Sequence, residues 1–185
     1  MLGEGQWKKL VRLFTLLDVD KSGAVEFTDL EQVMARTLAA SGHAPGSIIY
    51  DGAEAMLRRF WSELKQIADA NRDDRISRAE WLACWERLLD SEDTDSIFED
   101  LPHPVRQLHL LLAQALGVND LNGADRATWV RFAGSVGGDA SDAAFDSLDL
   151  DGNGLISQSE LQQLTAEFFL SNDAAPGDAL FGALA

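Results

Sequence analysis

The 185-residue sequence has little cysteine, few basic side chains and no long apolar run. Cys84 is the only cysteine, so the chain cannot form an internal disulfide, and the start at Met1 lacks a charged and then apolar signal segment. We therefore expect a reducing, cytoplasmic location. The longest apolar stretch, 108–118, contains polar residues and is shorter than the roughly 20 residues of a membrane span. Leu2 stands where a myristoylation signal needs glycine, so no membrane anchor is expected.

Basic residues are also scarce, with 15 lysines and arginines against 31 acidic residues and a formal net charge of -16. This excess argues against nucleic acid and anionic membranes as partners and favours cations. A hydrophobic content of 46% supports a folded globular chain. His43, His103 and His109 lack the spacing of zinc ligands, and Gly134–Gly138 matches no nucleophile or phosphate motif. We predict no catalytic residues and no enzymatic activity.

The stretch Asp149–Glu160 carries the most specific motif of the chain. Oxygen donors fall at positions 1, 3, 5, 7, 9 and 12 of a twelve-residue loop, and they are Asp149, Asp151, Asn153, the Leu155 carbonyl, Ser157 and Glu160. Gly154 at position 6 permits a sharp turn, and Ile156 at position 8 can anchor the loop in an apolar core. Because hard cations prefer an all-oxygen shell, this pattern predicts an EF-hand calcium loop.

A second loop with the same pattern runs from Asp18 to Asp29. Its predicted ligands are Asp18, Asp20, Ser22, the Ala24 carbonyl, Glu26 and Asp29. Asp29 replaces the usual glutamate at position 12, and its shorter side chain supplies one oxygen more readily than two. A lower coordination number favours magnesium, so we expect magnesium to compete with calcium here. Glu26 at position 9 can compensate by direct ligation.

A third loop runs from Asp69 to Glu80 and is also predicted to bind calcium. Its predicted ligands are Asp69, Asn71, Asp73, the Arg75 carbonyl, Ser77 and Glu80. Position 6 holds Asp74 in place of glycine. Aspartate is among the few residues that tolerate positive φ, so the turn is strained only mildly. Three calcium sites are therefore predicted.

A fourth repeat is expected before the Asp149 loop, but its residues do not supply the ligands of a calcium site. Taking Phe132 as the apolar residue after position 12 frames the loop as Asp120–Arg131. Ala124 then occupies position 5, and Arg131 places a fixed cation where the bidentate carboxylate belongs. We interpret this repeat as a degenerate hand that closes the structure around its neighbour without binding an ion.

EF-hand loops pair through a short antiparallel ribbon at positions 7 to 9. We expect Ala24–Glu26 to face Arg75–Ser77, and Arg126–Thr128 to face Leu155–Ser157. Helical periodicity indicates helices near 28–40 and 51–68. The predicted fold is all-α, with two packed pairs of hands in one compact unit. The expected organisation is an N-terminal pair (1–90), an acidic and proline-containing linker (91–104), a C-terminal pair (105–170) and a tail packing on the core (171–185).

Several segments together resemble the invertebrate sarcoplasmic calcium-binding proteins, especially the calexcitin branch, with bacterial calerythrins as more distant relatives. The resemblance rests on the 51-residue spacing from Asp18 to Asp69 and on the segments Trp61–Asn71, Glu80–Trp85, Glu167–Asp173 and Leu180–Gly182. It implies a compact four-hand protein that buffers calcium and magnesium or signals by a calcium-dependent change of shape. It also implies a tail that folds over the apolar interior. In such relatives the third loop can bind an ion, which Arg131 removes here.

We expect a cytoplasmic, monomeric protein that acts as a calcium and magnesium buffer or as a slow sensor. Two alternatives remain. One is a sensor that exposes a groove for an unknown target protein, although such grooves favour methionine and only Met1, Met34 and Met56 are present. The other is an EF-hand protein that holds a small ligand of the luciferin type. Tyr50 is the only tyrosine, so the polar aromatic cluster that such chemistry needs is missing.

Overall fold

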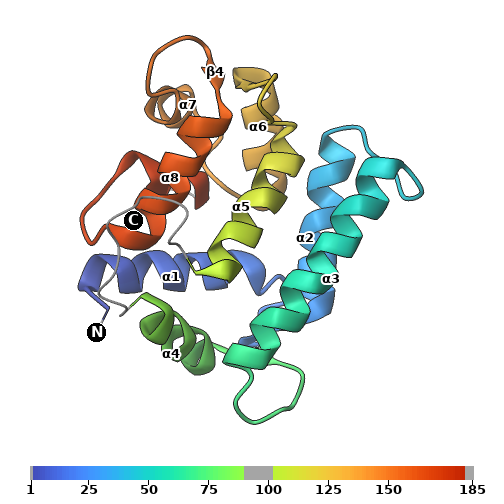
Figure 1. The fold of residues 1–185 in the computed structure, drawn as a ribbon, viewed down its shortest axis with the longest axis vertical. Helices are drawn as coiled ribbons and strands as arrows, with labels where there is room; N and C mark the ends of the chain where they lie inside the picture. Colours follow the sequence, from blue (N-terminus) through green and yellow to red (C-terminus); the bar gives the residue numbers. More distant parts are fainter. Residues whose placement is uncertain (1, 90–101, 182–185) are drawn as a thin grey trace.

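The computed structural model describes residues 2–89 and 102–181, and this part of the chain is mainly helical (Figure 1). The helices are α1 (Glu4–Leu17), α2 (Phe27–Ala40), α3 (Ile48–Ala68), α4 (Arg78–Leu89), α5 (His103–Leu116), α6 (Arg126–Val136), α7 (Asp142–Leu148) and α8 (Gln158–Leu170). Short strands join them: β1 (Ala24–Val25), β2 (Ile76–Ser77), β3 (Ala124–Asp125) and β4 (Leu155–Ile156), and a 3-10 helix, η1 (Pro176–Phe181), follows α8. The all-α prediction is confirmed. Among the described residues, no helix is both long enough and apolar enough to cross a membrane.

Helix boundaries follow local capping. The α3 helix begins at Ile48, three residues before the predicted start, because the Ser47 hydroxyl accepts a hydrogen bond from the Tyr50 amide at 3.2 Å. The α1 helix buries Leu10, Leu13, Phe14 and Leu17 at steps of three and four residues. The α1 helix ends directly before the loop that begins at Asp18, and α3 ends directly before the loop that begins at Asp69. Each helix therefore fixes where its loop begins.

The first ribbon forms in the predicted register. Strands β1 and β2 are antiparallel, with Ala24 opposite Ser77 and Val25 opposite Ile76. Val25 and Ile76 are fully buried, so the ribbon anchors both loops in the core. The first two hands therefore form a pair.

The second ribbon forms in a different register, and the predicted frame of the degenerate loop was wrong by three residues. Ala124 lies opposite Ile156 and Asp125 opposite Leu155, whereas Arg126–Thr128 were expected there. Since Ile156 is position 8 of its loop, Ala124 is position 8 of the degenerate loop, which therefore runs from residue 117 to residue 128.

Capping and burial explain this register. The α5 helix ends at Gly117, whose φ of 68° is a left-handed C-cap, and α6 begins after Asp125, whose carboxylate accepts a hydrogen bond from the Thr128 amide at 2.8 Å. Trp129 is fully buried directly after position 12, the place that the sequence frame gave to Phe132. Both aromatic side chains are buried one turn apart on α6, so sequence periodicity did not separate them.

The two pairs of hands pack against each other through their helices. The α2 helix lies on α6, α3 on α5, and α1 on α8. The α3–α4 loop and the α7–α8 loop lie at opposite ends of the molecule (Figure 1). One apolar core runs through both pairs and includes Trp81, Trp85 and Trp129. Most of the predicted linker, 91–104, falls on 90–101, which lies outside the described residues.

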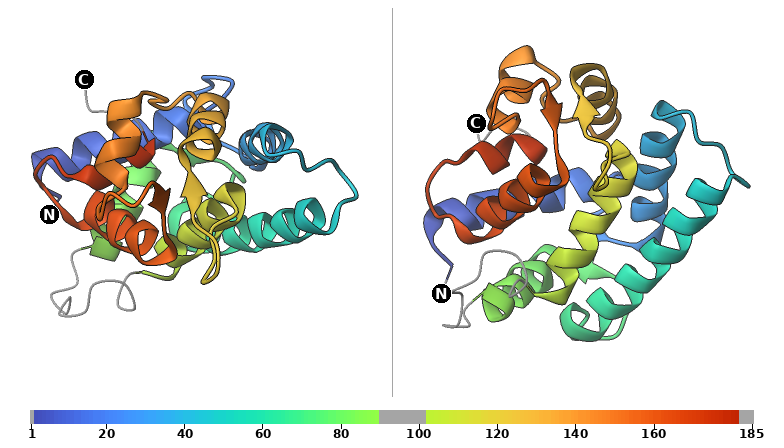
Figure 2. Two further views of the ribbon diagram at one scale, coloured as in Figure 1. Left: turned by 90° about the horizontal axis from the view of Figure 1, so that it is seen from above. Right: turned by 45° about the horizontal axis from the view of Figure 1, so that its top comes forward.

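The C-terminal segment packs back on three helices, one of which is the N-terminal helix α1. The η1 helix contacts α8, α7 and α1, and Figure 2 shows this red segment beside the blue α1 helix. Leu180 and Phe181 are buried, whereas Leu184 lies outside the described residues. The buried ammonium of Lys9 in α1 lies 2.7 Å from the Asp178 carboxylate. It also donates hydrogen bonds to the carbonyls of Ser171 and Asp173 at 3.1 and 2.9 Å.

Candidate metal centres

The first residue of each of the three acidic loops is held by the backbone of its own loop. One carboxylate oxygen of Asp149 accepts from the Asn153 amide at 3.0 Å, and the other accepts from the Gly154 amide at 2.8 Å. Asp18 accepts from the equivalent amides at 2.9 and 3.0 Å, and Asp69 at 3.2 and 3.0 Å. The carboxylate is therefore oriented by the loop itself.

This arrangement requires a left-handed residue at position 6. The φ angles are 85° at Gly23, 64° at Asp74 and 87° at Gly154. The expectation that Asp74 adopts positive φ is confirmed. Its carboxylate forms an ion pair with Lys65 in the last turn of α3, which offsets the extra negative charge at this position.

The glutamates at position 12 are also fixed from several sides. One oxygen of Glu160 accepts from the amides of Leu150 and Asp151 at 2.8 and 3.2 Å. The other accepts from the Ser157 amide at 2.7 Å and from its hydroxyl at 2.6 Å. Burial opposes ionisation of Glu160, but these hydrogen bonds outweigh it and lower the pKa of the carboxyl group. Glu80 makes the equivalent set of contacts, and the Ser77 hydroxyl makes the largest contribution to its lowered pKa.

Acidic side chains converge in two of the loops. In the described part of the chain, Asp149, Asp151 and Glu160 offer carboxylate oxygens that all lie within 4.8 Å of one another. Asp18, Asp20 and Asp29 form a second such group. The Asp69 loop, which carries the amide of Asn71 at position 3, does not form such a group in the described residues. The predicted carbonyl donors Ala24, Arg75 and Leu155 all lie in the ribbons or directly beside them.

The Asp18 loop departs from the other two at positions 9 and 12. Asp29 is buried, and its carboxylate oxygens accept from the Val19 amide at 3.2 Å and from the Glu26 amide at 2.9 Å. The Glu26 carboxylate at position 9 lies 2.8 Å from the guanidinium of Arg75, which belongs to the neighbouring loop. Hydrogen bonds from the Ser22 amide and hydroxyl lower the pKa of Asp20, and the positive charge of Arg75 lowers it further.

The degenerate loop has no acidic side chain at positions 1 and 12. In the frame that the ribbon fixes, Gly117 is position 1, Leu121 is position 5 and Thr128 is position 12. Arg131 lies one turn further along α6, where it is exposed and donates to the Thr128 hydroxyl at 3.0 Å. The missing ligands, and not the Arg131 cation, distinguish this loop. The glycine C-cap at 117 was the sequence signal that could have placed the frame correctly.

A comparison with protein families matches two of these loops, those that begin at Asp18 and Asp149. The family model described as EF hand matches residues 10–34 and 142–165. The chain is 33% identical over 73 residues to sarcoplasmic calcium-binding proteins of Branchiostoma lanceolatum. This alignment spans 40% of this chain and 40% of those relatives. The chain thus matches less than half the length of these curated relatives.

The fold matches over nearly the full length. The structure of a sarcoplasmic calcium-binding protein from amphioxus aligns over 99% of both chains, with a TM-score of 0.79 and 24% identity. The chain has the fold of this sarcoplasmic calcium-binding protein, and two of its segments match the EF-hand family model. A Streptomyces coelicolor calcium-binding protein aligns over 91% of this chain and 99% of its own, with a TM-score of 0.72 and 26% identity. The calcium-loaded apo form of the coelenterazine-binding protein from Renilla muelleri aligns over 99% and 100%, with a TM-score of 0.70 and 17% identity.

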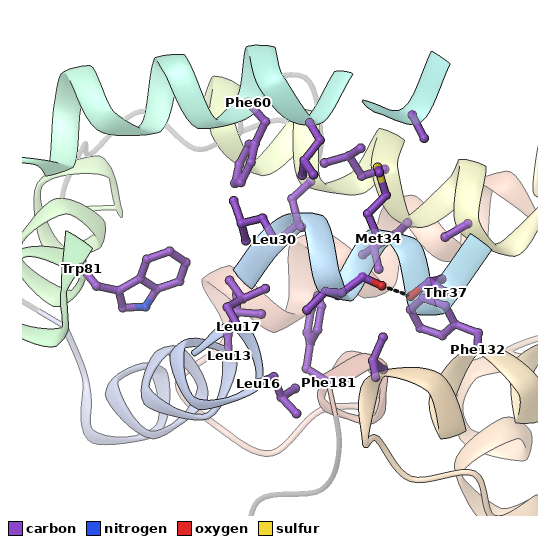
Figure 3. A pocket seen from close by; sticks show the side chains of 18 residues that line it. Leu13, Leu16, Leu17, Leu30, Met34, Thr37, Phe60, Trp81, Phe132 and Phe181 are labelled. Carbon is purple, nitrogen blue, oxygen red and sulfur yellow. Dashed lines mark hydrogen bonds between the residues drawn. The ribbon is translucent and has the colours of Figure 1, made fainter. Parts of the chain in front are cut away.

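The protein also contains an apolar cavity of about 110 Å³ between the two pairs of hands (Figure 3). Side chains from α1, α2, α3, α5 and α6 line it, together with Trp81 of α4 and Phe181 of the tail. Thr37 is the one polar residue among those that line it. Its hydroxyl donates to the Val33 carbonyl at 2.9 Å and accepts from the Ser135 hydroxyl at 3.3 Å. The polar group of the cavity wall is thus already engaged within the protein.

Proposed function

We propose that this protein binds calcium ions at the loops that begin at Asp18, Asp69 and Asp149, and that magnesium competes at the Asp18 loop. The observation that carries the proposal is the Asp149 loop, where three carboxylates converge and the position 1 and 12 side chains are held by loop amides. Such a donor set, made only of oxygen atoms, fits a hard divalent cation. The calcium-binding proteins of amphioxus and Streptomyces that share the fold support the same function.

The proposed sites are distributed unequally between the two halves. The N-terminal pair has two complete loops, whereas the C-terminal pair joins the Asp149 loop to a loop with glycine and threonine at positions 1 and 12. We expect two ions in the first half and one in the second. The ion at the Asp149 loop should therefore bind without a cooperative partner across its ribbon.

A calcium and magnesium buffer or slow sensor fits this architecture better than either alternative. Helices of the two pairs cover each other's apolar faces, so the described interior offers no separate groove in each half for a target helix. The cavity wall offers a hydroxylated aromatic chromophore one polar side chain, that of Thr37, and the Thr37 hydroxyl is already hydrogen-bonded within the protein. We further propose a monomer in a reducing, cytoplasmic compartment, in which the buried thiol of Cys84 stays unmodified.

Titration calorimetry with calcium, with and without millimolar magnesium, tests the proposal. The expected result is three calcium ions per chain. Millimolar magnesium should weaken calcium binding most at one site, the Asp18 loop. Glu160→Gln should remove one ion, because the position 12 carboxylate supplies two oxygens to the coordination shell. Glu86→Gln, which removes an exposed carboxylate on α4, is the matched control and should leave three. One ion or four in the unsubstituted protein would contradict the assignment.

The three sites can be followed separately through the amides at position 6. The amides of Gly23, Asp74 and Gly154 each donate to the first carboxylate of their own loop. An ion that binds this carboxylate must change that hydrogen bond, so the ¹⁵N–¹H signal of each amide reports on one loop. A loop whose amide signal does not respond to calcium or magnesium would lose its place in the proposal.

A further inference from the structure

We propose that Arg75, a residue of the second loop, determines the ion selectivity of the first loop by holding Glu26 out of the coordination shell. The inference rests on the proposed function of the Asp18 loop and names a residue that regulates it from outside that loop. Sequence spacing assigns Arg75 only a backbone carbonyl, as position 7 of its own loop. Its side chain has no role in that pattern.

The ribbon brings the two side chains together. Ala24 lies opposite Ser77 and Val25 opposite Ile76, so the next residue of the first chain segment, Glu26, comes opposite Arg75. The Arg75 guanidinium lies 2.8 Å from the Glu26 carboxylate. Directly opposed residues of an antiparallel pair are close enough for such a contact without any distortion of the backbone. The contact is thus built by the pairing of the loops.

The other two acidic loops use position 9 differently. The hydroxyls of Ser77 and Ser157 donate to the position 12 carboxylates of their own loops at 2.7 and 2.6 Å. In the first loop the Glu26 side chain at position 9 instead pairs with Arg75, a cation of the neighbouring loop.

This pairing has a direct consequence for coordination. While Glu26 is paired with Arg75, the first loop offers Asp18, Asp20, Ser22, the Ala24 carbonyl and the short Asp29, with water to complete a shell of about six. Such a shell suits the small, octahedral magnesium ion, which keeps bound water. Release of Glu26 would add a carboxylate and raise the coordination number, which favours calcium. Both side chains are partly exposed, at 44% and 38%, so the pair is weak enough for a divalent ion to compete with it.

Arg75→Gln is the decisive variant, and Arg72→Gln is its matched control. Arg72 lies in the same loop and carries the same charge, but the described residues provide it with no ion pair. With the Gly23 amide as reporter, Arg75→Gln should tighten calcium binding to the first loop by about two- to fivefold, the range that a cross-strand charge pair corresponds to. Magnesium binding should tighten less. Arg72→Gln should change neither constant at this loop by as much as twofold.

Two further measurements separate the pair from a general charge effect. In Glu26→Gln the Arg75→Gln substitution should no longer improve calcium selectivity, because no position 9 carboxylate remains to be released. In chelator, Arg75→Gln should lower the Tm of the ion-free protein relative to Arg72→Gln, since it removes a contact of that state. The same substitution thus weakens the ion-free protein and strengthens ion binding.

The outcomes for the inference and for the proposed function are distinct. If the Gly23 amide of the unsubstituted protein responds to neither ion, the proposed function of the first loop is overturned. If it responds, but Arg75→Gln and Arg72→Gln give the same calcium to magnesium ratio, only the role of Arg75 is overturned. A gain in selectivity that persists in Glu26→Gln would also refute it.

Discussion

Replacing Lys9 by methionine should destabilise the protein far more than the same change at its neighbour Lys8. The Lys9 side chain is 1% exposed and its ammonium meets the carboxylate of Asp178, which is 11% exposed. It also donates to the carbonyls of Ser171 and Asp173. Methionine keeps most of the apolar stem and its packing, so the change isolates the loss of the charge and its hydrogen bonds.

The size of the effect follows from what remains buried. Removing one partner of a buried ion pair costs about 3–5 kcal/mol, because the other charge stays in the interior unpaired. Since Asp178 keeps slight access to solvent and a hydrogen bond from the Ala175 amide, we expect the lower end, about 3 kcal/mol. For a chain of this length that corresponds to a fall in Tm of about 6–12 °C.

Thermal unfolding followed by circular dichroism in chelator measures this difference. Lys8→Met breaks only an exposed pair with Glu4 on the same helix and should leave the Tm nearly unchanged. The double variant Lys9→Met, Asp178→Asn should lose less than the sum of the two single changes, because it removes both charges. If Lys9→Met melts together with Lys8→Met, the buried pair does not hold the tail against α1.

Three further predictions concern the loops. Asp29→Glu should raise the preference of the first loop for calcium over magnesium, measured at the Gly23 amide, because the longer side chain can supply two oxygens; an unchanged ratio would contradict this. Thr128→Glu should leave the calorimetric count at three ions, since Gly117 and Leu121 still give no side-chain oxygen; a fourth ion would show that our frame is wrong. Folding lowers the pKa of Glu160, so its ionised form stabilises the ion-free protein above the ordinary pKa of 4.5, and this contribution disappears as pH falls through the folded-state pKa. The Tm in chelator should therefore fall more steeply with acidification than that of Glu160→Gln, and parallel curves would exclude the effect.

The local geometry of the three acidic loops was predictable because each loop consists of twelve consecutive residues. A carboxylate at position 1 and the amides that orient it are five residues apart or less, so local backbone geometry fixes them. The same locality explains the positive φ at Asp74. The degenerate loop was framed incorrectly because it lacks these ligands. Its frame had to be inferred from apolar spacing, and Trp129 and Phe132 satisfy that spacing equally well.

The sequence by itself determined the fold class and the positions of the three acidic loops, since each depends on periodicity or spacing along a short stretch of chain. Only the tertiary structure decided the register of the second ribbon, the contact of Glu26 with Arg75 and the buried pair of Lys9 with Asp178. These contacts join residues from 30 to 169 positions apart, and a charge in the sequence does not indicate which opposite charge it will meet. The pairing of loops within each half and the packing of the tail on α1 select these partners, and with them the environment of the first candidate metal site.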